Sequence, residues 1–202
     1  MSLIVILDFD GVIVDSIQGL FDCFGKFLKQ NGHKANQTSF DRYNGMKLRD
    51  ILLDLKSRYK ITKSITELRA DYEKLIDDVY QECNLMLGVK EFLDFCEIHK
   101  IPVCIASGTE RKNLINVFNR FNLNNRFQYT ITGDEVHQAK PNPEMYLKIK
   151  KGMGNSQYIV VDDSENGIEA AINADMKPVH FTKNSKNLNY LSVSSFMELT
   201  SL

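Results

Sequence analysis

The chain has 202 residues, of which 43% are hydrophobic, and its 25 basic and 26 acidic side chains leave a formal net charge of -1. This length allows one full core, or a core with a small inserted domain, and we expect the second. The balanced charge provides no field that would attract a nucleic-acid backbone or an anionic membrane, so we expect neither as a partner.

The cysteines and the N-terminal run both indicate a cytoplasmic protein. The cysteines form no CxxC pair and have no histidine at metal-ligand spacing, so we expect reduced thiols at Cys23, Cys83, Cys96 and Cys104. The apolar residues 3–7 have no basic segment before them and soon meet Asp8, which argues against a signal peptide and against a membrane span.

The same apolar run ends in two carboxylates. Residues 3–7 read LIVIL, which predicts a buried parallel strand, and Asp8, Asp10 and Gly11 follow at its carboxyl end. Open α/β sheets bind their ligands at that edge. Two buried carboxylates need a cation, a proton or solvent between them, so we expect Mg2+ at this place.

A helix follows the acidic turn. Apolar residues recur at spacings of three and four from Ile17 onward, which predicts an amphipathic helix that ends near Asn31. The residues before it, Asp15 and Ser16, are both of the types that cap helix N-termini. Either of these two side chains can therefore cap the start of the helix by accepting a hydrogen bond from its first turn.

The next stretch contains helical patterns only. Between about 38 and 83 no segment alternates as a strand would, and apolar residues again recur at three and four. We therefore expect a helical cap domain over residues 16–84, inserted into a core domain that comprises residues 1–15 and 85–202.

After Gly88 strands and helices alternate along the chain. Helices are expected at about 89–95, 110–121, 143–149 and 165–174, and strands at 102–106, 129–132, 158–161 and 178–181. A polar, Ser/Asn-rich tail follows, with one short helix near Phe196. The alternation implies right-handed βαβ crossovers, and thus a doubly wound α/β fold with a parallel sheet covered on both faces.

Polar side chains follow each of the later strands. Ser107 and Thr109 close one strand, Lys140 lies beyond the next, and Asp162 and Asp163 end a third. In a parallel sheet these ends lie along one edge, where they can meet the first pair of carboxylates. Taken singly, each residue has an ordinary interpretation as a helix cap, a loop residue or a surface charge. Only the combination is specific.

The segments that carry these residues resemble the motifs of the haloacid dehalogenase (HAD) superfamily. Residues 8–16, DFDGVIVDS, are similar to its first motif, and residues 104–109, CIASGT, to its second. Residues 139–146, AKPNPEMY, resemble the lysine motif of the small-capped members, and residues 160–171, VVDDSENGIEAA, their acidic motif. The resemblance covers about the whole chain and implies the branch of phosphoglycolate phosphatases and β-phosphoglucomutase.

The resemblance implies an aspartyl-phosphate mechanism. Asp8 would be the nucleophile that accepts a phosphoryl group, and Asp10 would be the general acid and base. Mg2+ would lie between Asp8, the main-chain carbonyl of Asp10 and Asp163, with Asp162 as a direct or water-mediated partner. The expected function is that of a magnesium-dependent phosphatase for a small phosphate monoester.

The phosphate contacts implied by the resemblance come from three segments. Ser107 and the amide of Gly108 would donate hydrogen bonds to the phosphoryl oxygens, and Lys140 would supply a positive charge. Residues 45–50, GMKLRD, resemble a loop that faces the substrate in relatives, which makes Lys47 and Arg49 candidate anion contacts. The alternative is that this pair is a solvated charge cluster at a helix start.

The chain departs from the family pattern in three places. Asp162 stands where relatives usually have glutamate, and Asp175 stands where glycine usually follows the last helix, in a left-handed position that aspartate adopts less easily. Leu20 occupies the position of a histidine that takes part in mutase chemistry, so hydrolysis is preferred over phosphomutase activity. The retained Asp10 disfavours the phosphonatase branch.

Two alternatives come from other classes of protein. A receiver domain also combines acidic residues, a hydroxyl and a lysine around Mg2+, but it has no helical insertion after its first strand. A catalytically silent HAD fold used for binding remains open, because a fold does not prove an activity. We also expect a monomer, since movement of a cap needs room.

Overall fold

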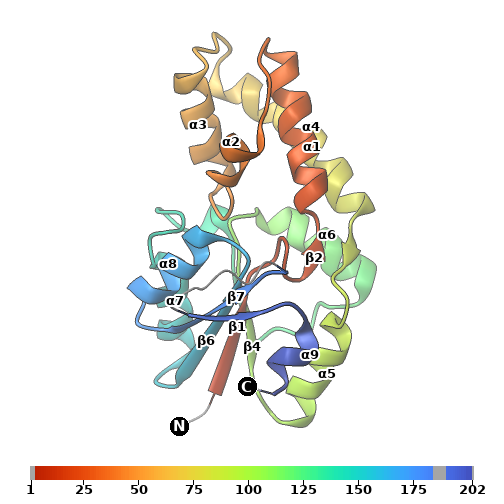
Figure 1. The fold of residues 1–202 in the computed structure, drawn as a ribbon, viewed down its shortest axis with the longest axis vertical. Coiled ribbons are helices and arrows are strands. Elements are labelled where there is room, and N and C mark those ends of the chain that lie inside the picture. The colour runs from red at the N-terminus through yellow and green to blue at the C-terminus, as the bar shows by residue number, and fades with distance from the viewer. Residues whose placement is uncertain (1–2, 184–189, 202) are drawn as a thin grey trace.

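The computed structural model describes residues 3–183 and 190–201, and shows an α/β core with a helical part above it (Figure 1). Within these residues, six parallel-paired strands form the core sheet. In spatial order they are β5 (Tyr129–Ile131), β4 (Val103–Ala106), β1 (Leu3–Leu7), β6 (Gln157–Asp162), β7 (Lys177–Phe181) and β8 (Leu191–Val193). The sheet confirms the predicted doubly wound α/β fold, with β1 in its interior.

Helices cover both faces of this sheet. Successive residues of β1 point to opposite faces, so each face packs against its own set of helices. Val5 and Leu7 pack into a buried cluster with α5 (Val89–Ile98), α6 (Arg111–Phe121) and α9 (Phe196–Leu199). Ile4 and Ile6 pack into a second cluster with α7 (Glu144–Met153) and α8 (Glu165–Asn173). A strand buried on both sides explains why the run is apolar throughout instead of alternating.

The helical part consists of α1 (Ile17–Gln30), α2 (Gln37–Asp41), α3 (Leu48–Arg58) and α4 (Ile65–Glu82), and it has an apolar core of its own. Its entry and exit are joined by two short antiparallel strands, β2 (Val14–Asp15) and β3 (Asn84–Leu85), which sequence analysis did not predict. This pairing is consistent with the proposed cap boundaries at residues 16 and 84, which stay a prediction.

The expected cap of α1 is wrong. Ser16 occupies the N-cap position, but its side chain makes no capping hydrogen bond, and Asp15 belongs to β2. The Ser16 hydroxyl instead donates to Oδ1 of Asp10 at 2.6 Å. A buried carboxylate forms a stronger, charge-assisted hydrogen bond than a helix amide can offer, so it takes the hydroxyl.

The C-terminal part of the core agrees with the sequence in two respects. Asp175 follows α8 with a φ of 56°, which confirms the left-handed position expected there. The short helix expected near Phe196 is α9. The short strand β8 was not predicted, and residues 184–189 of the polar tail lie outside the described residues.

All four cysteines are buried and unbridged, and burial raises the pKa of Cys23 and of Cys104 to about 12, which keeps both as thiols. In the part of the chain that the structure describes, no helix combines the length and the apolar character needed to cross a membrane.

Candidate active site

The ends of three neighbouring strands bring the predicted residues together beneath the helical part. Asp8 follows β1, Ser107 follows β4, Asp162 ends β6, and Lys140 reaches them from the loop before α7. All four are nearly inaccessible to solvent, although they are polar or charged. Because charged groups are almost never buried without partners, their contacts show what each one does.

Lys140 lies between two carboxylates. Its Nζ donates to Oδ1 of Asp8 at 2.6 Å, to Oδ2 of Asp162 at 2.7 Å, and to the carbonyl of Ala106 at 2.9 Å. Burial by itself lowers the pKa of Lys140, but the charges of Asp162 and Asp8 outweigh it, so the pKa lies well above its ordinary value. The ammonium therefore stays charged next to Asp8.

Asp162 is saturated with hydrogen bonds. Its Oδ2 also accepts from the Tyr146 hydroxyl at 3.0 Å, and its Oδ1 accepts from the amide and the hydroxyl of Ser164. With the Lys140 contact, all four acceptor sites of the carboxylate are in use. A β-carbon at Gly167 would lie 1.9 Å from this carboxylate, so only glycine fits there. Asp162 therefore positions Lys140. It could contact a metal ion through a water molecule, or directly if one of its hydrogen-bond donors moved away.

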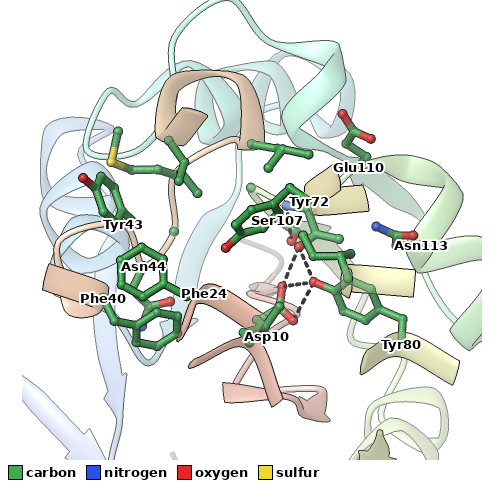
Figure 2. Close-up of a pocket in the computed structure, with 18 of the residues that line it drawn as sticks. Asp10, Phe24, Phe40, Tyr43, Asn44, Tyr72, Tyr80, Ser107, Glu110 and Asn113 are labelled. Atoms are coloured by element: carbon green, nitrogen blue, oxygen red, sulfur yellow. Dashed lines mark hydrogen bonds between the residues drawn. The ribbon is translucent and has the colours of Figure 1, made fainter. Parts of the chain in front are cut away.

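Asp10 accepts hydrogen bonds from three hydroxyl groups that come from different parts of the chain. Besides Ser16, the Thr109 hydroxyl donates to Oδ2 at 2.6 Å, and the Tyr80 hydroxyl lies 3.0 and 3.1 Å from the two carboxylate oxygens (Figure 2). Burial raises the pKa of Asp10, and the hydrogen bonds from Ser16, Thr109 and Tyr80 oppose this shift. A raised pKa suits a group that gives and takes a proton near neutral pH.

Sequence reasoning missed two of these partners. Tyr80 belongs to the apolar spacing of α4 and was interpreted as a buried helix residue, and Ser16 was interpreted as a helix cap. Thr109 was recognised as a strand-end residue, but its contact with Asp10 was not predicted. The signal that could have identified Tyr80 is a tyrosine near the end of the last cap helix, where the chain returns to the core.

Three carboxylates could hold a metal ion. Asp8, Asp162 and Asp163 each offer an oxygen, and these oxygens lie within 4.8 Å of one another. Oδ1 of Asp163 is buried without a hydrogen-bond partner, while Oδ2 accepts only a long hydrogen bond, 3.4 Å, from Asn44. Burial and then the charge of Asp162 raise the pKa of Asp163 to about 8. This oxygen-rich cluster, in which Oδ1 of Asp163 lacks a hydrogen-bond partner, fits a hard cation such as Mg2+.

We expect Mg2+ to bind more weakly at pH 6 than at pH 8. At pH 6 Asp163 is protonated, and the pKa of Asp8 is also raised by burial, so a cation must displace protons. The deprotonated fraction of a group with a pKa near 8 falls from about one half to about one hundredth over this range, which predicts roughly a tenfold or larger loss of affinity. Isothermal titration calorimetry at both pH values checks this, with Asp163→Asn as the variant in which the dependence weakens. Equal affinity at both pH values would mean that no ligand of the metal binds a proton between pH 6 and pH 8.

Lys47 and Arg49 do not take the places expected from the resemblance. The Lys47 ammonium donates to the main-chain carbonyls of Val136, at 3.2 Å, and of His137. Arg49 is exposed on the first turn of α3, and neither side chain lines the cavity above Asp8. In this arrangement Lys47 links the cap to the core, because it donates to carbonyl groups of a core loop. The role of Lys47 and Arg49 in anion binding stays a prediction without geometric support.

The segment before Lys47 also lies against the core. A β-carbon on Gly108 would come within 2.6 Å of the Met46 carbonyl and 2.8 Å of the Gly45 carbonyl, so this cap loop packs directly on the glycine after Ser107. The side chain of Asn166 donates to the carbonyl of Asn44 at 2.8 Å. The cap is therefore closed over the strand ends.

A cavity of about 80 Å³ lies between the cap and the strand ends (Figure 2). Its floor contains Asp8, Asp10, Ser107, Gly108 and Thr109, so the residues predicted for transfer and for phosphate contact face the same space. Its walls come mostly from the cap and are largely apolar: Leu20, Phe24, Phe40, Tyr43, Met46, Leu48, Ile51, Tyr72, Ile76 and Tyr80.

A parallel sheet that presents paired aspartates, a serine and a buried lysine below a helical lid defines a capped phosphotransfer-type hydrolase fold. Comparison with known families agrees: the model of the haloacid dehalogenase-like hydrolase family matches residues 5–181. The chain belongs to this family, which confirms the family and the hydrolase class predicted from the motifs.

The chain is similar in sequence to curated phosphatases and similar in fold to solved structures. It is 26% identical over 186 residues to a phosphorylated carbohydrates phosphatase of Thermotoga maritima, covering 91% of this chain and 86% of that protein. It is 25% identical to (DL)-glycerol-3-phosphatase 2 of Arabidopsis thaliana, covering 87% and 77%. The structure of β-phosphoglucomutase from Clostridium difficile superimposes with a TM-score of 0.86 at 22% identity, covering 98% and 93%, which shows a shared fold.

Proposed function

We propose that this chain is a magnesium-dependent phosphatase that hydrolyses a small phosphate monoester through an aspartyl-phosphate on Asp8. The observation that carries the proposal is the position of Asp8, which is paired with the buried Lys140 and faces a cavity also lined by Asp10 and Ser107. The relatives named as phosphatases of phosphorylated carbohydrates, glycerol 3-phosphate, 6-phosphogluconate and phosphoglycolate support this choice.

In the first step the chain aligns a nucleophile and a proton donor. Lys140 holds Oδ1 of Asp8, which leaves the other oxygen for in-line attack on phosphorus. Ser107 and Gly108, on the floor of the cavity, would donate hydrogen bonds to the phosphoryl oxygens. The P–O bond to the alcohol breaks, and the alcohol oxygen takes a proton from Asp10.

In the second step Asp10 takes a proton from water, whose oxygen attacks the phosphorus and releases Asp8 and phosphate. Mg2+, held by Asp8, Asp163 and the predicted Asp10 carbonyl, would neutralise charge between the anionic nucleophile and the anionic phosphate. The closed cap excludes other water, and this favours the aligned reaction.

Leu20 supports hydrolysis over phosphomutase chemistry. It lines the cavity, and its aliphatic side chain can neither give nor take a proton. The likeness to β-phosphoglucomutase concerns the fold. We further propose that the protein works as a monomer in the cytoplasm, where its four free thiols suit a reducing environment.

The proposed function is tested by phosphate release from a panel of small phosphate esters, with Mg2+ and with a chelator. Release that depends on Mg2+ is the expected result. No release from any ester, from a protein whose fold is intact by circular dichroism, would exclude a phosphatase and turn attention to isomerisation of sugar phosphates.

We expect Asp10→Asn to slow both steps of the reaction, because an amide cannot transfer a proton. The loss of kcat should be about 10²- to 10⁴-fold for alkyl phosphates, in line with general acid–base catalysis. Acetyl phosphate has a leaving group that needs no protonation, so here only the second step should slow. Rapid quench should then trap phosphoenzyme in Asp10→Asn, and its failure to accumulate would contradict the assigned role.

A further inference from the structure

The charged side chains that line the cavity all have the same sign. Among the described residues that line it, the charged ones are all acidic, namely Asp8, Asp10, Glu73 and Glu110, and there is no lysine, arginine or histidine. Asp8 and Asp10 serve the reacting phosphate, so the space for the rest of a substrate has apolar walls and two carboxylates. Such a space offers no counter-charge to a second anionic group.

Two cationic side chains pair with the acidic residues of these walls. Arg69, on α4, lies between Glu73 at 2.7 Å and Glu110 at 2.6 Å, and Lys112 lies 3.5 Å from Glu73. Lys140 lies beneath the floor between its own two carboxylates. Because Arg69 is already paired with both glutamates, these cations leave no surplus positive charge for an anionic substrate tail.

One polar group on the wall has unused hydrogen-bonding capacity. Asn113, on α6, is only 4% exposed, lines the cavity, and its Oδ1 has no hydrogen-bond partner. In Figure 2 it lies on the side of Tyr80 and Glu110, across the cavity from Phe40 and Tyr43. A substrate hydroxyl can donate to an amide oxygen or accept from an amide nitrogen, so it satisfies Asn113 in either orientation of the amide.

We propose that the site selects phosphate esters of small, uncharged, hydroxylated alcohols, whose free hydroxyl bonds to Asn113, and rejects alcohols that carry a carboxylate or a second phosphate. This inference rests on the proposed phosphatase function. The cavity has a volume of about 80 Å³, which favours a small alcohol.

Matched substrate pairs test the charge preference. 2-Hydroxyethyl phosphate differs from 2-phosphoglycolate, and glycerol 3-phosphate from 3-phosphoglycerate, by one change of CH2OH to a carboxylate. We expect kcat/KM to be at least about tenfold higher for the hydroxyl member of each pair, at pH 7.5 with Mg2+, because an unpaired charge in a closed site is poorly tolerated. Equal or higher values for the carboxylates overturn the inference.

Acetyl phosphate separates this failure from failure of the proposed function. If acetyl phosphate and all four esters stay intact, the phosphatase function itself is wrong. If acetyl phosphate is hydrolysed and the hydroxyl members are not preferred, only the inference on substrate class is wrong.

The variant Asn113→Leu tests the hydrogen bond. Leucine has the same branched arrangement of side-chain heavy atoms as asparagine and suits a buried position on α6, so the fold should persist. We expect kcat/KM for 2-hydroxyethyl phosphate to fall about fivefold or more, the loss of roughly one hydrogen bond, while ethyl phosphate is affected less than twofold. The control is Asn119→Leu, at an exposed position of the same helix. An equal loss for both esters would mean that Asn113 only supports the wall.

Discussion

Asp8→Asn is expected to abolish turnover. The amide is a poor nucleophile and cannot form the aspartyl-phosphate, so phosphate release should fall by at least about 10⁴-fold, as for other enzymes that lose a covalent nucleophile. The fold should persist, because burial and the neighbouring charges of Asp162 and Asp163 already disfavour a charged Asp8, as its raised pKa indicates. Phosphate release and mass spectrometry of the acid-quenched enzyme measure both predictions.

The matched control is Asp15→Asn, which removes an exposed carboxylate of β2 from the same segment. It should keep the wild-type rate. Wild-type enzyme quenched during turnover should carry one phosphoryl group on the peptide that contains Asp8. Asp8→Asn that retains measurable turnover and a phosphorylated peptide would place the nucleophile elsewhere.

Lys140→Met is expected to remove activity and to destabilise the protein. Methionine fills similar space but leaves Asp8 and Asp162 buried without a cation, and breaking a buried ion pair in this way costs about 3–5 kcal/mol. Because Asp8 loses its positive neighbour, its pKa rises further, and the charged form that can attack phosphorus becomes less populated. We expect kcat to fall by at least about 10³-fold, since charge stabilisation of the phosphoryl group is lost as well.

The loss of stability should depend on pH in a definite direction. A carboxyl group whose pKa is raised in the folded state binds more protons there than in the unfolded chain, so folding weakens as the pH rises above its ordinary pKa. The destabilisation in Lys140→Met should therefore be smaller at pH 5 than at pH 8. Urea unfolding without metal at both pH values measures it. Lys151→Met, at an exposed position of α7, should change stability by less than about 0.5 kcal/mol. A destabilisation that is the same at pH 5 and pH 8 would mean that the buried carboxylates are not what Lys140 neutralises.

Periodicity along the chain predicted most of the fold because it reports burial within a single element. The apolar run at residues 3–7 is buried on both faces as β1, and the spacing after Ile17 is that of α1. The strands that escaped prediction are β2, β3 and β8, each of two or three residues. Such a strand is too short for alternation to be visible, and it exists because a partner lies beside it in space.

The candidate site, like the fold, could be predicted from the sequence only in part. The family could be predicted from the sequence, and so could the meeting of Asp8, Ser107, Lys140 and Asp162 at one sheet edge, because residues that follow parallel strands lie there. Which group each of them contacts depends on the tertiary structure. Tyr80 reaches Asp10 across 70 positions of the chain, Lys47 reaches His137 across 90, and Lys140 reaches Asp8 across 132. The direction of a long side chain depends on how distant elements pack, and local patterns do not record that packing.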